Sequence, residues 1–258
     1  MAENWKSDFA RRWKYYTPPG RASPSDIKKF SSTLREIIKK KGKENVNILL
    51  LGSTPEFRVV CAREGVRCVI VDYNPTSFEI MSEEVTVPHP HEKYVEEDWN
   101  NIKFVEEFDL IYGDLIINVT KKQEHDRILK NINEALKKEG VFVLRSFIKK
   151  ENENHSFEEV FGKKWHCMMC KGRYVYWFAS KKDDITRFKD CWKLTLKAHN
   201  MGLISEEEFE YFKNIGWSEF SFEFYFPFRK DLEKKIKSHF AIDEIFFGTE
   251  EYIEDLYP

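Results

Sequence analysis

The chain has 258 residues, of which 41% are hydrophobic, 33% charged and 16% aromatic, which suits one folded domain with an appended segment and excludes a disordered or collagen-like protein. No apolar run approaches the roughly 20 residues that a membrane helix needs, and residues 1–16 lack the apolar core of a signal peptide, so we expect a cytoplasmic protein with no membrane partner. The net charge is −2, but residues 1–43 hold 12 Lys and Arg against 4 Asp and Glu, and the rest of the chain is acidic.

The first predicted element is a helix within the basic N-terminal segment, residues 1–43. Thr17-Pro18-Pro19-Gly20 is a chain break. Ser23 then precedes Pro24, and Asp26 follows three residues after the serine, which is the pattern of a capped helix start. Gly42 ends the helix. One helix face carries its apolar residues, Ile27, Phe30, Leu34, Ile37 and Ile38.

Residues 44–150 alternate short apolar runs with helical patterns. Gly65 and Gly140 are predicted helix ends, and Pro55 and Pro75 are predicted first helical positions. Five such alternations predict a mostly parallel, twisted sheet with helices on both faces, which binds ligands beyond the carboxyl ends of its strands. The predicted strands are Val46–Leu51, Cys68–Asp72, Tyr94–Glu97, Phe108–Gly113 and Val141–Phe147.

Residues 151–228 do not continue this alternation, and we predict an insertion that lies beside the ligand edge of the sheet as a substrate lid. In residues 229–258, the helix Lys230–Ser238 and the strand Phe240–Phe247 are predicted to complete the sheet. Within the insertion we predict helices at Ser156–Glu159, Asp184–Asn200 and Ser205–Ile215, and extended segments at Arg173–Ala179 and Ser221–Phe226. Its aromatic residues form the insertion's own core or line a pocket, namely Trp165, Tyr174, Tyr176, Trp177, Phe178 and Trp192.

The first two strand ends carry a nucleoside-binding pattern. Gly52 follows the first strand, and Asp72 ends the second strand 20 residues later, where a carboxylate can accept both ribose hydroxyls. The turn G-S-T-P-E-F has a single glycine, whereas a pyrophosphate cradle needs three. The pattern therefore favours an adenosine ligand without a pyrophosphate and disfavours a nicotinamide-dependent oxidoreductase.

These features resemble the class I S-adenosylmethionine-dependent methyltransferases, closely over residues 46–147 and loosely over residues 229–247. The resemblance implies an α/β, three-layer αβα Rossmann-like fold, here with an N-terminal helical head and an insertion after strand five, and S-adenosylmethionine as the cofactor. It places the methionine part of the cofactor at the first turn, the ribose at the second strand end and the adenine at the third. The implied cofactor-binding residues are Gly52, Ser53, Thr54, Pro55, Glu56, Asp72, Tyr73, Asn74, Asp98 and Trp99.

Two positions depart from the pattern of that family. Leu50 stands where an acid usually contacts the cofactor's amino group, and Thr54 stands where a second glycine is usual. Glu56 or Arg21 is therefore a candidate to bind the amino acid end of the cofactor.

Asp114, just past the fourth strand, is the candidate catalytic residue. Methyl transfer from a sulfonium is an in-line displacement that depends mainly on position, so Asp114 would orient or deprotonate the acceptor; otherwise it caps the following loop. We expect His89 and His91 to be exposed or to contact substrate, and Tyr112 to be a core residue.

The five cysteines include one Cys167-Met-Met-Cys170 motif. Cys191, His166 and His199 could complete a zinc site, and a CxxC pair can also be redox-active. The odd number of cysteines disfavours structural disulfides, so we predict unpaired, semi-buried cysteines and no metal.

The favoured function is methyl transfer to a small-molecule acceptor. The alternatives are an RNA- or protein-directed methyltransferase that uses the basic head, and a non-catalytic relative that retains the fold. In the head, Trp5, Trp13, Tyr15 and Tyr16 alternate with Lys and Arg, a pattern that can track nucleic acid. The head could equally fold over the cofactor cleft and help to bind a small acidic substrate.

Overall fold

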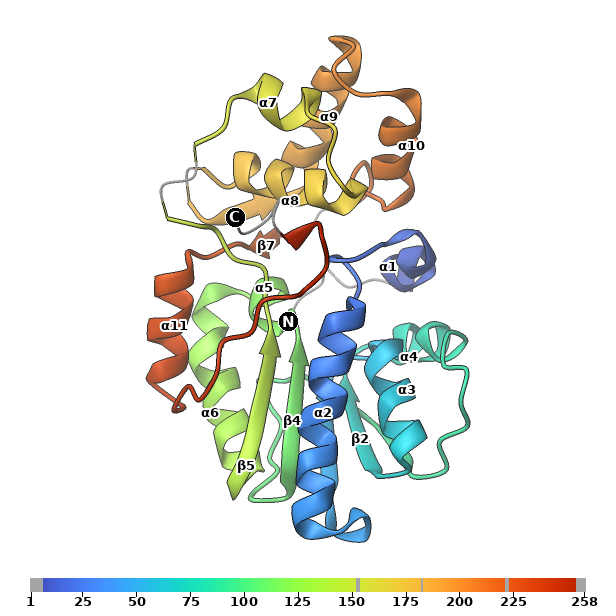
Figure 1. Ribbon diagram of the computed structural model, residues 1–258, viewed down its shortest axis with the longest axis vertical. Helices are drawn as coiled ribbons and strands as arrows, with labels where there is room; N and C mark the ends of the chain where they lie inside the picture. Colours follow the sequence, from blue (N-terminus) through green and yellow to red (C-terminus); the bar gives the residue numbers. More distant parts are fainter. Residues whose placement is uncertain (1–6, 152–153, 182, 221–222, 254–258) are drawn as a thin grey trace.

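The computed structural model describes residues 7–151, 154–181, 183–220 and 223–253; the predicted contributions of Trp5 and of Ser221 lie outside these residues. At its centre is a parallel five-stranded sheet in the order β3-β2-β1-β4-β5, with helices on both faces (Figure 1). This confirms the predicted α/β class. The strands are β1 (Asn47–Leu51), β2 (Arg67–Asp72), β3 (Glu92–Glu96), β4 (Phe108–Asp114) and β5 (Leu136–Arg145).

The sheet separates two hydrophobic cores, and β1 shows how. Because successive side chains of a strand point to opposite faces, Ile48 and Leu50 join the core beneath α2 and α3, whereas Leu49 and Leu51 join the core beneath α6. A strand buried on both faces reads as an unbroken apolar run. The helices that flank the sheet are α2 (Pro24–Lys41), α3 (Pro55–Glu64), α4 (Pro75–Ser82), α5 (Ile116–Val119), α6 (His125–Ala135) and α11 (Arg229–Lys237).

The start of α2 matches the prediction in detail. The Ser23 hydroxyl accepts a hydrogen bond from the Asp26 amide, and the Asp26 carboxylate accepts one from the Ser23 amide. Phe30 and Leu34 are fully buried on the inner face of the helix, and the chain leaves the helix at Gly42. In the described part of the chain, no helix combines the length and apolar character needed to cross a membrane.

The N-terminal helix and the insertion lie beyond the carboxyl ends of the strands (Figure 1). Helix α1 packs against α4, and the insertion builds a third core around the buried indole of Trp217. The two parts thus face one another across the ligand edge of the sheet. Their elements are α1 (Ser7–Arg12), η1 (Trp13–Tyr15), α7 (Phe157–Gly162), α8 (Met168–Ala179), β6 (Ile185–Arg187), α9 (Phe188–Asn200), α10 (Glu206–Asn214) and β7 (Glu223–Tyr225).

Two predictions for the insertion were wrong. Arg173–Ala179 is not extended but forms most of α8, because the helix is capped at Cys167 and its aromatic side chains find partners in the third core. The helix predicted from Asp184 begins only at Phe188, since Ile185–Arg187 pairs antiparallel with β7. The short β7 lies within the predicted extended segment Ser221–Phe226.

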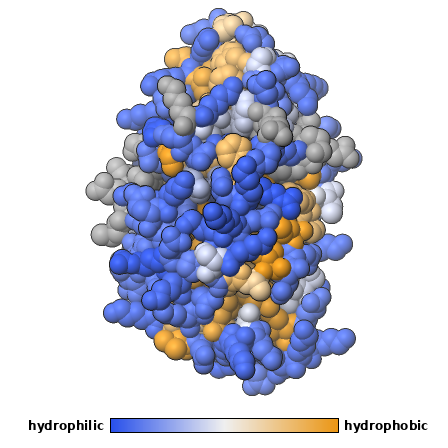
Figure 2. Space-filling view, turned by 90° about the vertical axis from the view of Figure 1, so that its left-hand side faces the viewer, coloured by the Kyte–Doolittle hydropathy of each residue, from blue (hydrophilic) through white to orange (hydrophobic). Residues whose placement is uncertain are grey.

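The predicted sixth strand, Phe240–Phe247, is not a strand. Residues 240–247 run beside β5 without forming strand hydrogen bonds to it. In the described chain, β5 pairs only with β4. Phe240 instead stacks on Phe142 of β5. Helix α6 also ends at Ala135, five residues before the predicted Gly140, and β5 starts directly at Leu136. The side of the molecule that carries α6, α11 and β5 shows a patch of apolar side chains in its lower half (Figure 2).

Asp109 joins three elements at the amino end of the sheet. It is 1% exposed, and its carboxylate accepts hydrogen bonds from Lys41 at 2.7 Å, Lys137 at 2.7 Å and the Asn47 amide at 2.9 Å. Burial opposes ionisation, but the two lysines outweigh it and lower the pKa of Asp109. The end of α2 and the starts of β1 and β5 therefore depend on one charge.

Asp109→Asn should destabilise the protein by about 2–3 kcal/mol at neutral pH, below the range for a fully buried pair because both lysines reach solvent. Since the pKa of Asp109 is lower in the folded state, its contribution is lost as the pH falls through that lowered pKa. Urea denaturation at two pH values measures this. Asp126→Asn is the matched control, because Asp126 is an exposed partner of Lys235 and His239, and it should stay within about 0.5 kcal/mol of wild type. Equal losses at both positions would contradict the expectation.

Candidate active site

A cavity opens where the carboxyl ends of β1, β2 and β4 meet the head and the insertion. Three groups of residues line it, and they come from the strand ends, from α1 and η1, and from the insertion. The strand-end group is Gly52, Ser53, Thr54, Asp72, Tyr73, Asp98, Trp99, Asn100, Asp114, Leu115, Val119 and Thr120. The head group is Phe9, Ala10, Trp13, Tyr16 and Gly20, and the insertion group is Met169, Tyr176, Phe188 and Phe224. Ser77, Met81, Glu124 and Phe147 complete the lining.

The turn after β1 is shaped by Gly52. Its φ of +98° belongs to the region that favours glycine, and a Cβ there would lie 3.6 Å from the indole of Trp99. The turn aims two hydroxyl groups at carboxylates on neighbouring strand ends. Ser53 donates to Asp72 at 2.8 Å, and Thr54 donates to Asp114 at 2.8 Å.

Asp72 presents a half-buried carboxylate to the cavity. It accepts hydrogen bonds from Ser53 and from the Asn74 amide at 3.1 Å, and in the described chain no cation pairs with it. Desolvation by burial exceeds the effect of these hydrogen bonds and raises the pKa of Asp72. A carboxylate that remains under-compensated after its protein contacts is suited to accept donors from a ligand.

The third strand end supplies a carboxylate and a fixed indole. Asp98 accepts hydrogen bonds from the backbone and side-chain nitrogens of Asn100, at 2.9 and 3.0 Å. The Trp99 Nε1 donates to the Val71 carbonyl at 2.9 Å, and Asn131 of α6 donates to the Trp99 carbonyl at 3.0 Å. Trp99 is therefore held at its ring nitrogen and at its backbone carbonyl, and its indole offers a fixed apolar surface.

Four of the predicted cofactor residues do not line this cavity: Pro55, Glu56, Asn74 and Arg21. Pro55 is buried at the first position of α3, and Asn74 caps α4 by accepting a hydrogen bond from the Ser77 amide. Arg21 and Glu56, the candidates to bind the amino acid end of the cofactor, bind each other at 2.6 Å.

Asp114 lies at the cavity wall with both oxygens engaged. Arg145 donates to one at 2.6 Å, and Thr54 donates to the other at 2.8 Å. Burial lowers the pKa of the Arg145 guanidinium, but attraction to Asp114 and Asp26 outweighs this and raises it. Because both oxygens of Asp114 already accept a hydrogen bond within the chain, the geometry favours orientation over deprotonation for this carboxylate.

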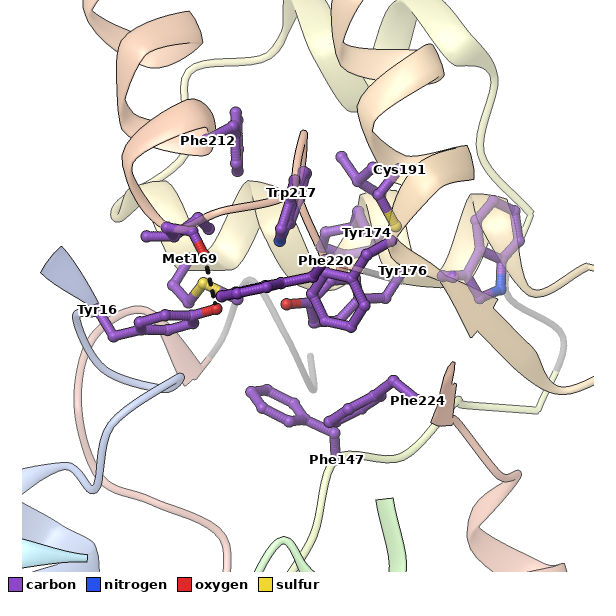
Figure 3. Packing of buried hydrophobic residues seen from close by; sticks show 14 of the residues in the cluster. Tyr16, Phe147, Met169, Tyr174, Tyr176, Cys191, Phe212, Trp217, Phe220 and Phe224 are labelled. Carbon is purple, nitrogen blue, oxygen red and sulfur yellow. Dashed lines mark hydrogen bonds between the residues drawn. The ribbon is translucent and has the colours of Figure 1, made fainter. Parts of the chain in front are cut away.

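Aromatic rings from the head, the insertion and Phe147 gather in one cluster (Figure 3), and several of them line the cavity. The Tyr16 hydroxyl donates to the Ile215 carbonyl at 3.0 Å, which ties the head to the insertion. Tyr176 of α8 packs against Phe147 and Phe224. Of the six insertion aromatics singled out from the sequence, only Tyr176 lines the cavity. The others belong to or pack against the hydrophobic core of the insertion, which is the first of the two interpretations given above.

The charges of the lining are all carboxylates. Among the described residues that line the cavity there is no Lys, Arg or His. Two basic side chains of the head are engaged elsewhere, since Arg12 binds Glu219 and Arg21 binds Glu56 and Glu84. The head thus folds over the cavity, but it contributes aromatic faces and does not bring cations to an acidic substrate.

Sequence reasoning missed Phe147 and the structural role of Asn118. The Asn118 amide is fully buried; it donates to the carbonyls of Phe147 and Tyr225 and accepts from the Phe147 amide. It thereby joins the loop after β4 to β5 and the insertion. A polar residue within the apolar run Leu115–Val119 was the only available signal.

The predictions for two histidines and one tyrosine can be compared with the structure. His89 was predicted to be exposed, but its side chain is 3% exposed and its Nε2 lies 2.8 Å from the Val66 carbonyl oxygen; His91 is exposed. Neither lines the cavity. Tyr112 is a core residue, as expected.

The cysteine prediction was also wrong in part. Cys167 and Cys170 form a disulfide, because Cys167 caps α8 and the first turn of that helix brings the two Cα atoms to 5.2 Å. Cys61, Cys68 and Cys191 are free and buried. Within the described ranges, no group of three or more His, Cys, Asp or Glu side chains is placed to hold a metal ion.

Comparison with known proteins identifies the domain. Residues 51–144 match the family model described as a methyltransferase domain, whereas no curated protein matches. A solved S-adenosylmethionine-dependent methyltransferase from Methanosarcina mazei is 17% identical, with 81% of this chain and 85% of that chain covered and a TM-score of 0.52. A putative zinc-dependent alcohol dehydrogenase from Rhodobacter sphaeroides is 11% identical, with 95% and 94% covered and a TM-score of 0.54.

A third solved structure, the N-methyltransferase NodS from Bradyrhizobium japonicum in complex with S-adenosyl-L-homocysteine, is 15% identical, with 54% and 72% covered and a TM-score of 0.41. At such identities structural likeness shows the fold alone. The methyltransferase match spans the strands whose ends line the cavity. Residues 51–144 thus match a methyltransferase domain, and the fold is similar to that of a solved S-adenosylmethionine-dependent methyltransferase, in agreement with the resemblance that the strand-end motifs carry.

The residues present fit that cofactor. Asp72 offers a half-buried, under-compensated carboxylate of the kind that ribose hydroxyls satisfy. Gly52 leaves open the space beside the Trp99 indole that a Cβ would enter. Both features lie in the one cavity.

Asp72→Asn should separate folding from binding. Because burial raises the pKa of Asp72, the native state holds the proton to higher pH than the unfolded state, and the stability contributed by this group falls as the pH rises through the raised pKa. At neutral pH the asparagine should therefore leave the midpoint of thermal unfolding unchanged or raise it.

The same variant should bind S-adenosylhomocysteine about tenfold or more weakly, because charge-assisted hydrogen bonds are lost. Calorimetric titration beside a thermal melt measures both effects, with Asp126→Asn as the control. Wild-type affinity in Asp72→Asn would remove Asp72 from the site.

Proposed function

We propose that the protein transfers a methyl group from S-adenosylmethionine to a small-molecule acceptor within this cavity. The observation that carries the proposal is the enclosure of the cavity. Trp13 and Tyr16 of the head and Tyr176 and Phe188 of the insertion line it together with the strand ends. A macromolecular acceptor would have to displace one of these walls to reach the cofactor.

In this proposal the strand ends hold the cofactor. Asp72, oriented by Ser53, accepts the ribose hydroxyls, and Trp99 covers the adenine next to Asp98. Because Gly52 has no side chain, the cofactor can approach the protein backbone closely at the first turn. S-adenosylmethionine supplies the electrophilic methyl group, and these residues fix where that group lies.

The acceptor class follows from the lining. Aromatic faces attract cations and apolar groups, whereas a cavity with carboxylates and no basic side chain repels anions. We therefore propose a largely apolar acceptor that is neutral or carries a positive charge. Methyl transfer needs the nucleophile in line at about 3 Å, which a closed aromatic cavity can enforce.

Glu124 is the group we propose for anchoring the acceptor or taking its proton. It lines the cavity from η3 (Lys122–Glu124), ahead of α6. Of the other lining carboxylates, Asp114 is bound to Arg145, and Asp72 and Asp98 lie at the proposed adenosine side. Burial raises the pKa of Tyr176 well above its usual value, so this phenol stays neutral and acts only as a hydrogen-bonding group.

The RNA-directed alternative is less well supported. Arg12 and Arg21 are two of the basic residues next to the cavity, and both are held in contacts within the chain. Nucleic-acid affinity depends on cations available to phosphates. A cytoplasmic location, expected from the composition, is part of this proposal, and microscopy of a tagged chain would test it.

The first experiment is a titration with S-adenosylmethionine, S-adenosylhomocysteine and, because a dehydrogenase shares the fold, NAD. We expect saturable binding of both sulfur ligands and none of NAD. Methyl uptake from labelled cofactor would then be measured on paired amines, phenols and their carboxylated analogues, with transfer RNA beside them. Transfer to carboxylated acceptors or to RNA alone would contradict the proposed acceptor class.

Glu124→Gln should lower kcat/KM for an acceptor found in this way by about a hundredfold, the usual range for loss of a general base. The amide keeps the size of the side chain and can still accept the hydrogen bond from the Lys121 amide. The affinity for S-adenosylhomocysteine should change by less than about threefold. Glu134→Gln, an exposed partner of Lys130 on α6, is the control. An unchanged kcat/KM in Glu124→Gln would exclude this role.

A further inference from the structure

The first turn of α8 carries the Cys167–Cys170 disulfide, which the proposed reaction does not use. Cys167 is the N-cap residue of this 12-residue helix, and its Sγ accepts a hydrogen bond from the Cys170 amide at 3.0 Å. The bond spans three positions along the chain. Such a short loop restricts the unfolded chain less than a long loop does, so stability is a weak reason for this disulfide.

The two sulfurs differ in access. Cys167 is partly exposed, whereas Cys170 is fully buried. The other three cysteines, Cys61, Cys68 and Cys191, have at most 1% of their surface exposed. Of the five cysteines, Cys167 is therefore the one that an external thiol can approach most readily.

Met169, which lies between the two cysteines, connects the disulfide to the cavity. It lines the cavity and is 1% exposed. A Cβ on Gly20 would approach the Met169 Cγ to 3.1 Å, and a Cβ on Gly172 would approach its Cε to 3.1 Å. The Met169 side chain is thus confined between Gly20 of the head and Gly172, which lies three residues further along α8. Two turns further along, α8 presents Tyr176 to the same cavity.

We propose that Cys167–Cys170 is a reversible redox site whose state sets the position of Met169 in the cavity wall. The redox part stands on the disulfide alone, and the link to methyl transfer rests on the proposed function. The reacting partner is a dithiol reductant. Its thiolate attacks the Cys167 sulfur, a mixed disulfide forms, and Cys170 leaves as a thiolate.

The second thiol of the reductant then releases Cys167 and closes the reductant's own disulfide. The protein gains two electrons and two protons, and the reductant loses the same number. Without the covalent bond, the first turn of α8 is held only by its hydrogen bonds, so Met169 gains freedom at the cavity wall.

Thiol trapping of the native full-length protein tests the redox part. The protein is equilibrated in mixtures of reduced and oxidised dithiothreitol, alkylated with N-ethylmaleimide, digested and analysed by mass spectrometry. We expect Cys167 to be labelled reversibly and without denaturant in reducing mixtures, while the buried Cys170, Cys61, Cys68 and Cys191 stay unlabelled until the protein is denatured. A pair that opens only in denaturant, or that stays reduced in every mixture, would overturn the proposal.

Methionine methyl NMR tests the coupling without any ligand. Protein labelled at the methionine methyl groups, with Met169 assigned from Met169→Leu, should show a shift of the Met169 signal on reduction. Cys167→Ser keeps a hydroxyl that can cap α8 but removes the disulfide. This variant should show the spectrum of the reduced protein in both oxidising and reducing buffer. Cys191→Ala is the control and should keep the redox response. A Met169 signal that does not move would overturn the coupling.

The affinity for S-adenosylhomocysteine is then compared between the two redox states. We expect a change of about fivefold or more, the lower end of coupling between linked sites. Equal affinity in both states would refute control of the cofactor site. If neither state binds S-adenosylhomocysteine, the proposed function fails, while trapping and NMR still decide the redox site.

Discussion

The arrangement of the cavity depends on one buried guanidinium. Arg145 ends β5 with its side chain 11% exposed, and a cation in that position needs acceptors on every nitrogen. It binds the Asp114 carboxylate and the carbonyl oxygens of Pro19 and Gly20. The chain after η1 must therefore cross above the strand ends, and this crossing brings Trp13 and Tyr16 over the ligand edge. The same guanidinium holds Asp114 in place. One charge therefore positions both the chain segment that covers the cavity and a carboxylate that lines it.

A second buried polar group fixes the opposite wall. The Asn118 amide satisfies backbone groups of Phe147 and Tyr225 that would otherwise be unpaired in the core. Because Tyr225 belongs to β7 and Phe147 follows β5, the insertion is tied to the loop after β4. The cavity is enclosed because two polar side chains hold its walls. Arg145 binds the chain of the head, and Asn118 binds the insertion at Tyr225.

Sequence reasoning was reliable where local pattern and tertiary burial agree. Apolar runs identified β1, β2 and β4 closely, whereas β3 and β5 start two and five residues before the predicted strands. The carboxyl-end rule placed Gly52 and Asp72 at one edge of the sheet, where the structure has them. It failed where tertiary context overrides propensity. Arg173–Ala179 is rich in aromatic residues that favour strands, yet it is helical because Cys167 caps the helix and a large core receives its rings. Phe240–Phe247 has a strand composition, but propensity does not specify a pairing partner. Contacts such as Arg145 with Pro19 join residues far apart in the chain, which no local pattern encodes.

The composition of the cavity wall matches the charge that methyl transfer moves. The cofactor of this class brings a positive sulfonium and leaves as a neutral thioether, so the positive charge passes to the acceptor. Aromatic faces and carboxylates stabilise that charge at either position, whereas a lysine or arginine in the wall would oppose it at both. Tyr16 and Tyr176 remain neutral because burial raises their pKa values. On the proposed function, Arg145 is tolerated beside the cavity because Asp114 and backbone carbonyls compensate its charge, and no Lys, Arg or His among the described residues lines the cavity itself.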